Sequence, residues 1–119
     1  SHTRKEPFNP MPYEIVMYSR FSPCPYVRTA KRVLEREKIP YREIYIDEDP
    51  AAKQRVIEWT GFQSVPTLIL TQPGEIEPYA PPEPLAEGAS PKGIDRGTMI
   101  TEPGEAQLER WLQKHGFIG

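Results

Sequence analysis

This sequence of 119 residues contains a single cysteine, Cys24, and only two histidines. One cysteine excludes any disulfide within the chain and any cysteine-rich metal cage. A free thiol is typical of a reducing compartment, so we expect a cytoplasmic protein. No run approaches the roughly 18 consecutive apolar residues of a membrane-spanning helix, and no signal peptide is evident, so no membrane association is expected.

The chain also lacks a large net charge. Its 15 basic and 17 acidic residues give a formal charge of −2, which predicts neither a nucleic-acid partner nor an anionic membrane surface. Basic side chains nevertheless outnumber acidic ones between Arg20 and Lys38. A positive field there would favour a thiolate at Cys24 and a small anionic partner. Beyond Arg28 we favour the plainer interpretation of an exposed helix face.

Proline, by contrast, is abundant, and its positions divide the chain. Pro7, Pro10 and Pro12 predict an extended N-terminal arm over residues 1–12, which begins with a Ser-His pair typical of tag removal. Residues 13–119 are predicted to form one domain. Within that domain, the proline-rich residues 72–91 predict a surface loop insertion, for which flexible decoration is favoured over a docking role.

Hydrophobic patterning predicts an α/β order of elements. Strands are expected where apolar and β-branched residues concentrate, at residues 14–19, 41–46, 65–71 and 98–100. Helices are expected at residues 26–38, 50–60 and 102–115. Asp49 and Thr101 are typical N-caps, and Gly61 and Gly116 are typical C-terminal stops. The resulting order, β-α-β-α-β-β-α, predicts a sheet covered by helices.

The lone cysteine occupies a position where thiols are often reactive. It follows the first predicted strand and a short loop, and it stands at the beginning of the first predicted helix. The unpaired amides and the positive end of the helix dipole favour a thiolate at such a position, and the thiolate is the nucleophile. The alternative is an inert core cysteine.

Two short motifs carry a resemblance to a known family. Cys24-Pro25-Tyr26-Val27 resembles the Cys-Pro-Tyr-Cys site of glutaredoxins, with valine replacing the second cysteine. Ser64-Val65-Pro66 resembles their Thr-Val-Pro motif, and residues 59–61, Trp-Thr-Gly, precede it at the family's usual spacing. The resemblance covers residues 14–71. It implies a thioredoxin-like fold, in which a central mixed sheet is flanked by helices.

The resemblance also implies an activity, namely thiol-disulfide exchange with Cys24 as the catalytic nucleophile. Without a second cysteine at position 27, the mechanism is monothiol: a second molecule of a small thiol must release the product. Glutathione or another low-molecular-weight thiol is the implied co-substrate, and no tightly bound cofactor or metal is expected. The implied partners are glutathionylated or other mixed-disulfide proteins, and the protein is expected to be a monomer.

The binding residues for the small thiol follow from the same resemblance. Pro66 resembles the family's cis-proline, which turns the backbone of Val65 toward the cysteine. The family's Gly-Gly turn and helix-start Asp are missing here, so another cellular thiol remains an alternative to glutathione. Thr101 and Glu102 are the candidates at the corresponding position, at the beginning of the last predicted helix. The implied ligand-binding residues are Arg20, Tyr26, Gln63, Ser64, Val65, Pro66, Thr101 and Glu102.

Two alternatives to the enzyme hypothesis remain. Some single-cysteine members of the family hold a [2Fe–2S] cluster between two protomers together with glutathione, although Pro25 is unlike the small residue usual there. The other alternative is a non-catalytic thioredoxin-fold module that binds a partner through residues 72–91.

Overall fold

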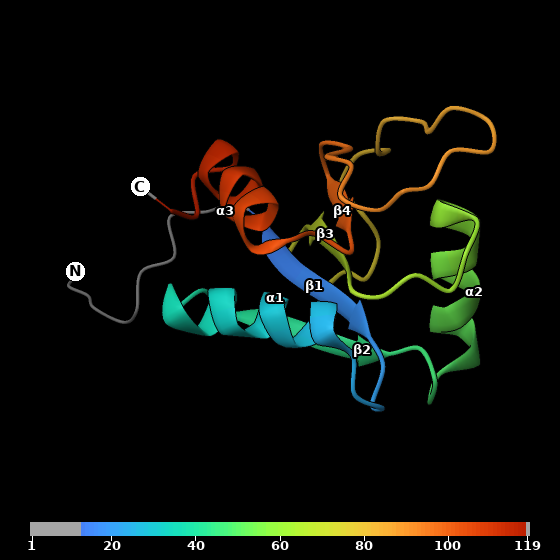
Figure 1. Cartoon of the computed structure of the whole chain (residues 1–119), viewed down its shortest axis with the longest axis horizontal. Coiled ribbons are helices and arrows are strands. Elements are labelled where there is room, and N and C mark those ends of the chain that lie inside the picture. Colours follow the sequence, from blue (N-terminus) through green and yellow to red (C-terminus); the bar gives the residue numbers. More distant parts are fainter. Residues whose placement is uncertain (1–12, 119) are drawn as a thin grey trace.

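The structure, a computed structural model, describes residues 13–118, so the predicted arm at residues 1–12 lies outside the described residues. Four strands and three helices follow one another in the predicted order (Figure 1). Their bounds are β1 Glu14–Ser19, α1 Pro25–Arg36, β2 Tyr41–Tyr45, α2 Pro50–Thr60, β3 Thr67–Thr71, β4 Met99–Thr101 and α3 Glu105–Lys114. In this part of the chain, no helix is both long and apolar enough to cross a bilayer.

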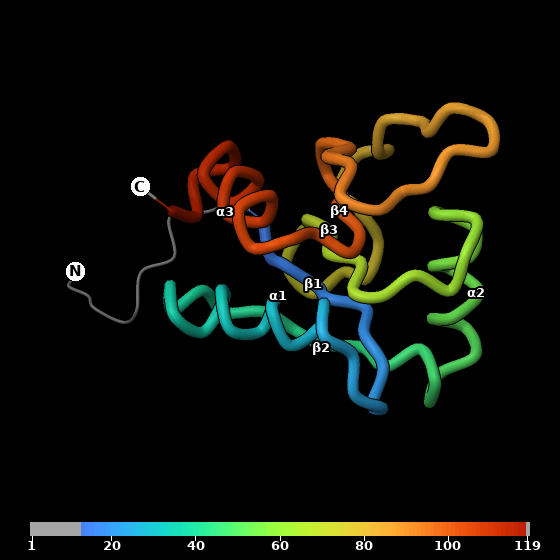
Figure 2. The backbone as a smooth tube through the Cα atoms, viewed as in Figure 1, coloured from blue at the N-terminus to red at the C-terminus, as the bar shows by residue number. Residues whose placement is uncertain are grey.

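The four strands form one mixed sheet. Their spatial order is β2-β1-β3-β4, with β1 parallel to β2 and antiparallel to β3, and with β3 antiparallel to β4. Helices α1 and α3 lie on one side of this sheet and α2 lies on the other (Figures 1 and 2). This arrangement confirms the predicted thioredoxin-like fold.

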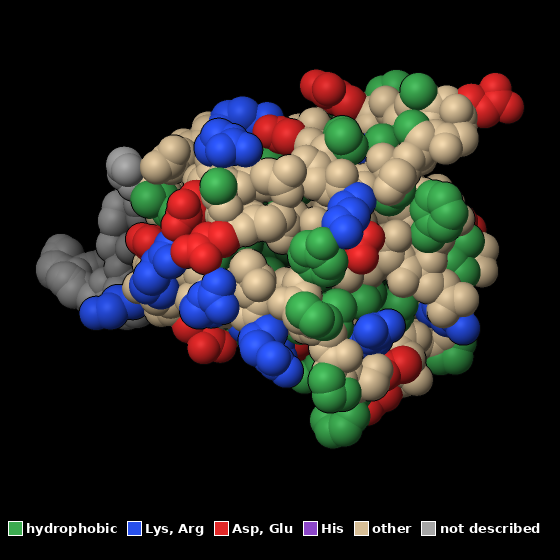
Figure 3. Space-filling view, viewed as in Figure 1, with side chains coloured by type: hydrophobic (Ala, Val, Ile, Leu, Met, Phe, Trp, Pro, Cys, Tyr) green, Lys and Arg blue, Asp and Glu red, His purple; other side chains and the backbone are tan. Residues whose placement is uncertain are grey.

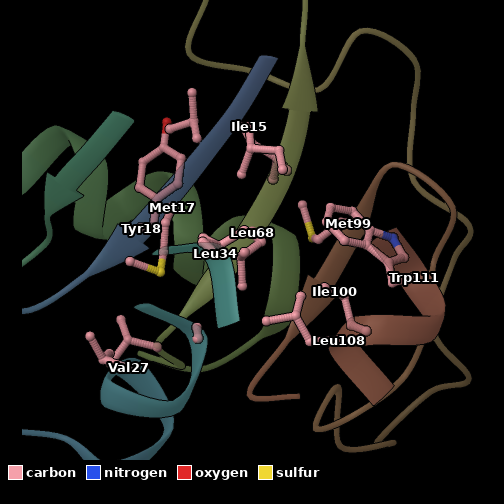
Figure 4. Packing of buried hydrophobic residues seen from close by; sticks show 14 of the residues in the cluster. Ile15, Met17, Tyr18, Val27, Leu34, Leu68, Met99, Ile100, Leu108 and Trp111 are labelled. Carbon is pink, nitrogen blue, oxygen red and sulfur yellow. The ribbon is translucent and has the colours of Figure 1, made fainter. Parts of the chain in front are cut away.

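The two central strands are covered on both faces. Residues 15–19 of β1 and all of β3 are buried, which agrees with sequences that are apolar without strict alternation. Side chains of α1 and α3 pack against these strands, as Figure 4 shows for Met17, Leu34, Leu68 and Leu108. Ala52 and Val56 of α2 belong to the same core cluster. Burial of these side chains supplies the main stabilisation of the fold.

The local signals at the second helix are confirmed. The Asp49 carboxylate accepts hydrogen bonds from the amides of Ala51 and Ala52, at 3.1 and 3.3 Å. Gly61 ends the helix with φ +84°, a left-handed conformation that glycine adopts without the steric cost of a Cβ atom. The predicted stripe of this helix is buried at Ala52 and Val56 and half-buried at Trp59.

The beginning of the last helix was predicted wrongly. Thr101 is not an N-cap: it is the last residue of β4, and its fully buried hydroxyl lies 3.2 Å from that of Thr67 in the neighbouring strand. Helix α3 begins at Glu105, and Gly104 occupies the N-cap position. The Gln107 side chain accepts a 2.7 Å hydrogen bond from the Gly104 amide. Pairing in the sheet therefore overrides the local capping preference of Thr101.

Residues 72–98, which we call the proline-rich segment, connect β3 to β4 without a helix or ladder strand of their own. The segment is tied to the domain by Arg96, which is only 7% exposed. Its guanidinium donates to the carbonyl oxygens of Glu83 and Trp59, each at 2.7 Å. The Thr98 hydroxyl donates to the Ala80 carbonyl at 3.0 Å. Side chain–backbone bonds thus take the place of regular secondary structure here.

Much of the basic charge of α1 is used in contacts with α3. Arg32 lies 3.0 Å from Glu105, and Arg36 lies 2.9 Å from Glu105 and 2.5 Å from Glu109. Figure 3 shows basic and acidic side chains intermingled over the surface of these two helices. This finding agrees with the interpretation of residues beyond Arg28 as an exposed helix face.

Candidate active site

Cys24 is the N-cap residue of α1, and Pro25 takes the first helical position. The Cys24 carbonyl accepts the first helical hydrogen bond, from the Arg28 amide at 3.0 Å. No acidic side chain lies in the first turn of α1. Cys24 is buried, with 9% of its surface exposed. The thiol is therefore placed where the helix dipole favours negative charge.

An aspartate that the sequence analysis missed holds the loop before the cysteine. The Asp47 carboxylate accepts the Phe21 amide at 3.0 and 3.1 Å, and it accepts the Ser22 amide at 3.4 Å. Asp47 follows β2, which runs parallel to β1. The carboxyl ends of parallel strands meet at one edge of a sheet, so the topology contained a signal for this contact.

The segment before β3 forms the second wall of the site. The Cys24 thiol donates to the Val65 carbonyl, with 3.9 Å between sulfur and oxygen. The Val65–Pro66 peptide bond is cis. Val65 is only 4% exposed, and its amide has no hydrogen-bond acceptor among residues 13–118. A buried amide without an acceptor is costly, so this group is available to a bound molecule.

Bonds from the sheet fix this wall. The Thr67 hydroxyl donates to the Ser64 carbonyl at 2.9 Å, and the Glu102 amide donates to the Pro66 carbonyl at 2.8 Å. Glu102 has φ +46°, an unusual conformation for a residue other than glycine. Residues 64–66 are thereby joined to the chain that leaves β4.

A lysine from the proline-rich segment reaches the beginning of α1. The Lys92 ammonium lies 4.5 Å from the centroid of the half-buried Tyr26 ring. The polar interaction with Tyr26, together with a smaller contribution from Glu102, raises the pKa of Lys92 and keeps the ammonium charged. No sequence pattern signals this contact, since Lys92 is far from Tyr26 along the chain.

The remaining predicted site residues differ in how far they are exposed to solvent. Arg20 is exposed, and its guanidinium donates to the Pro23 carbonyl at 3.5 Å, beside the Cys24 loop. Gln63 is exposed next to the buried Ser64. The exposed rings of Phe21 and Phe62 also belong to the segments on either side of the site. Thr101 is fully buried, and its hydroxyl lies 3.2 Å from that of Thr67.

Part of this chain is similar to known proteins. Residues 15–72, which include both motifs, match the family model described as glutaredoxin. A similar solved structure is the holo form of glutaredoxin C1 from Populus tremula x tremuloides. It is 18% identical, and the alignment covers 87% of this chain and 76% of that chain at a TM-score of 0.44. No curated protein gives a significant match to this chain.

Proposed function

Because residues 15–72 belong to the glutaredoxin family, we propose that this protein reduces protein mixed disulfides through Cys24, with glutathione or a similar small thiol as co-substrate. The family and fold support a thiol-disulfide oxidoreductase-like function. The observation that carries the finer proposal is the cysteine itself. It occupies the N-cap position of α1, and its thiol donates to the Val65 carbonyl with 3.9 Å between sulfur and oxygen.

The proposed reaction has two exchange steps. In the first step, the Cys24 thiolate attacks the glutathione sulfur of a protein–glutathione disulfide. A new S–S bond forms at Cys24 while the old one breaks, and the protein leaves as a thiolate that takes up a proton. In the second step, a further glutathione thiolate attacks the adduct and restores the Cys24 thiolate. The protein is reduced, and two glutathione molecules leave as their disulfide.

A monothiol course follows from the residue at position 27. Val27 occupies the place of the family's second cysteine, and it is 6% exposed within the core cluster. Its side chain has no chemistry with which to resolve an adduct on Cys24. The chain has no other cysteine. Release of the adduct therefore depends on a thiol from outside the protein.

The walls of the site supply contacts for the small thiol. The Val65 amide, which has no acceptor among the described residues, is suited to a backbone carbonyl of a peptide-like thiol. Tyr26 lies in the first turn of α1, two residues after Cys24, and Arg20 contacts the Pro23 carbonyl in the loop before Cys24. The proposed ligand-binding residues are Arg20, Tyr26, Gln63, Ser64, Val65, Pro66 and Glu102.

The test is reduction of a glutathione mixed disulfide on a peptide by wild type and by Cys24→Ser. We expect the rate to fall by on the order of a thousandfold or more, because the covalent nucleophile is removed. Equal rates for the two proteins would overturn the proposal.

The monothiol course has a separate control, Val27→Cys, which recreates the family's two-cysteine site. With limiting oxidised glutathione, wild type should accumulate a glutathione adduct on Cys24 that intact-mass spectrometry detects. Val27→Cys should instead lose the adduct and form an internal disulfide. Wild type that never holds the adduct would contradict the proposed intermediate.

A further inference from the structure

We propose that Lys92 makes this site selective for small thiols that bear a carboxylate, because its ammonium lies beside the first turn of α1. This inference rests on the proposed function, since it concerns the co-substrate of Cys24. It adds a residue from the proline-rich segment to a site whose other residues lie near the two motifs or directly after β4.

A series of contacts leads from Cys24 to Lys92 and from Lys92 back to the first turn of α1. The Cys24 thiol faces the Val65 carbonyl at 3.9 Å, and the next carbonyl, that of Pro66, accepts the Glu102 amide at 2.8 Å. The chain before Glu102 pairs with the backbone at Lys92. The Lys92 ammonium then returns to Tyr26, two residues after the cysteine, at 4.5 Å from its ring centroid. Lys92 therefore lies on the rim of the same site.

The backbone at Lys92 is firmly held. The preceding residue, Pro91, is buried, and the Gly93 amide donates to the Thr101 carbonyl at 2.7 Å. Gly93 has φ +74°, and a Cβ atom there would lie 2.8 Å from the Gln107 side-chain nitrogen. The left-handed φ favours glycine here, and any Cβ atom would also displace the Gln107 side chain. A lysine presented from a fixed backbone loses less freedom when it binds an anion.

The charge environment favours an anion at this position. The Lys92 ammonium lies 4.5 Å from the Tyr26 ring centroid, and because a lysine ammonium carries several hydrogen-bond donors, donors remain for a carboxylate. Arg20 and Arg28 are exposed near the same end of α1, and the described first turn contributes no acidic residue. Glu102 is the nearby carboxylate that competes for Lys92. A ligand carboxylate therefore meets a mainly positive rim.

The experiment compares two disulfides that differ in charge. The rate of adduct formation on Cys24 is followed by intact-mass spectrometry with oxidised glutathione, which carries carboxylates, and with 2-hydroxyethyl disulfide, which is neutral. Lys92→Ala should slow the glutathione reaction about two- to fivefold, the size expected of an exposed charge contact. The reaction with the neutral disulfide should stay the same, and the difference should shrink at high salt.

Three further variants sharpen the test. Lys92→Glu should slow the glutathione reaction roughly tenfold, because attraction becomes repulsion. Lys92→Arg should retain the wild-type ratio of the two rates. Arg110→Ala, which removes the same charge from an exposed position of α3, is the matched control and should leave the ratio unchanged.

The two proposals fail in different ways. If wild type reacts with both disulfides and the Lys92 variants alter both rates equally, or neither rate, the role of Lys92 is overturned while the proposed function stands. If Cys24 reacts with neither disulfide, the proposed function fails and the role of Lys92 fails with it. A larger effect of Arg110→Ala than of Lys92→Ala would also overturn the assignment.

Discussion

Two parts of this domain are held together by different means. We call residues 14–71 the first half and the proline-rich segment the second half. Residues 14–71 form β1, α1, β2, α2 and β3, and their backbone polar groups are paired within helices and sheet ladders. The proline-rich segment, residues 72–98, is rich in a residue that has no amide hydrogen to donate. Its bonds to the rest of the domain come from scattered positions, among them the buried Arg96, whose guanidinium donates to the Trp59 carbonyl.

This difference explains how the site is assembled. The first half supplies the reactive group and its walls, Cys24 and Val65, from positions that helix and strand geometry determine. The second half supplies Lys92, whose place depends on bonds between distant parts of the chain. We therefore expect the chemistry to follow from the first half and the selectivity from the second.

The largest effect is expected in the core of the first half. Leu68 is fully buried at the centre of β3 (Figure 4). Leu68→Ala should lower the free energy of unfolding by about 2–5 kcal/mol, because it removes buried apolar surface and leaves a cavity. Leu85→Ala, at a half-buried position of the proline-rich segment, should cost about 1 kcal/mol or less. Urea unfolding measures both values; equal losses would contradict the contrast between the halves.

The next effect concerns the anchor of the second half. Arg96→Ala should lower the free energy of unfolding by about 2–3 kcal/mol, because two part-buried hydrogen bonds from a buried, charged donor are lost. Arg42 is the matched control: it also donates to the segment, at the Glu75 carbonyl, but from an exposed position.

Arg42→Ala should therefore cost about 1 kcal/mol or less. Hydrogen exchange should show faster exchange at the Glu83 amide, which donates to the Arg96 carbonyl, in Arg96→Ala. If Arg42→Ala destabilises the protein more than Arg96→Ala does, burial is not what makes the anchor effective.

The smallest expected effect is a pH dependence of the free energy of unfolding. It arises where α3 meets the end of the proline-rich segment. Burial lowers the pKa of His115 below its ordinary value of 6.5, with a further contribution from Lys114, while the Gly97 carbonyl and Asp95 partly oppose the shift. The His115 Nε2 atom lies 2.8 Å from the Gly97 carbonyl. The lowered pKa means that the folded state favours the neutral ring over the charged one. The contribution of His115 to the free energy of unfolding is therefore fully present above pH 6.5, and it is lost as the pH falls through the folded pKa.

Unfolding of wild type and His115→Gln between about pH 7 and pH 5 measures this contribution. Wild type should lose stability more steeply on acidification than the variant. Parallel pH profiles would show that His115 does not contribute.

Sequence patterns predicted the site unevenly. The position of Cys24 before a helix follows from local signals, and the structure confirms it. Pro66 was predicted within a strand at residues 65–71, but β3 begins only at Thr67. Thr101 was misassigned because its local preference for capping a helix is weaker than the pairing of β4 with β3. Asp47 could have been found from the parallel pairing of β1 and β2. Lys92 could not, because no local pattern specifies which side chain a long connection brings back.

The amino-acid sequence by itself determined the element order, the caps Asp49 and Gly61, and a lone thiol at a helix N-terminus. These features depend on side-chain periodicity and on interactions within a few residues. Only the tertiary structure decided that Arg96 ties down the proline-rich segment and that Lys92 meets Tyr26. Such contacts join residues far apart in the chain, and they form only once folding of the core has offset the entropy of closing the long connection between them.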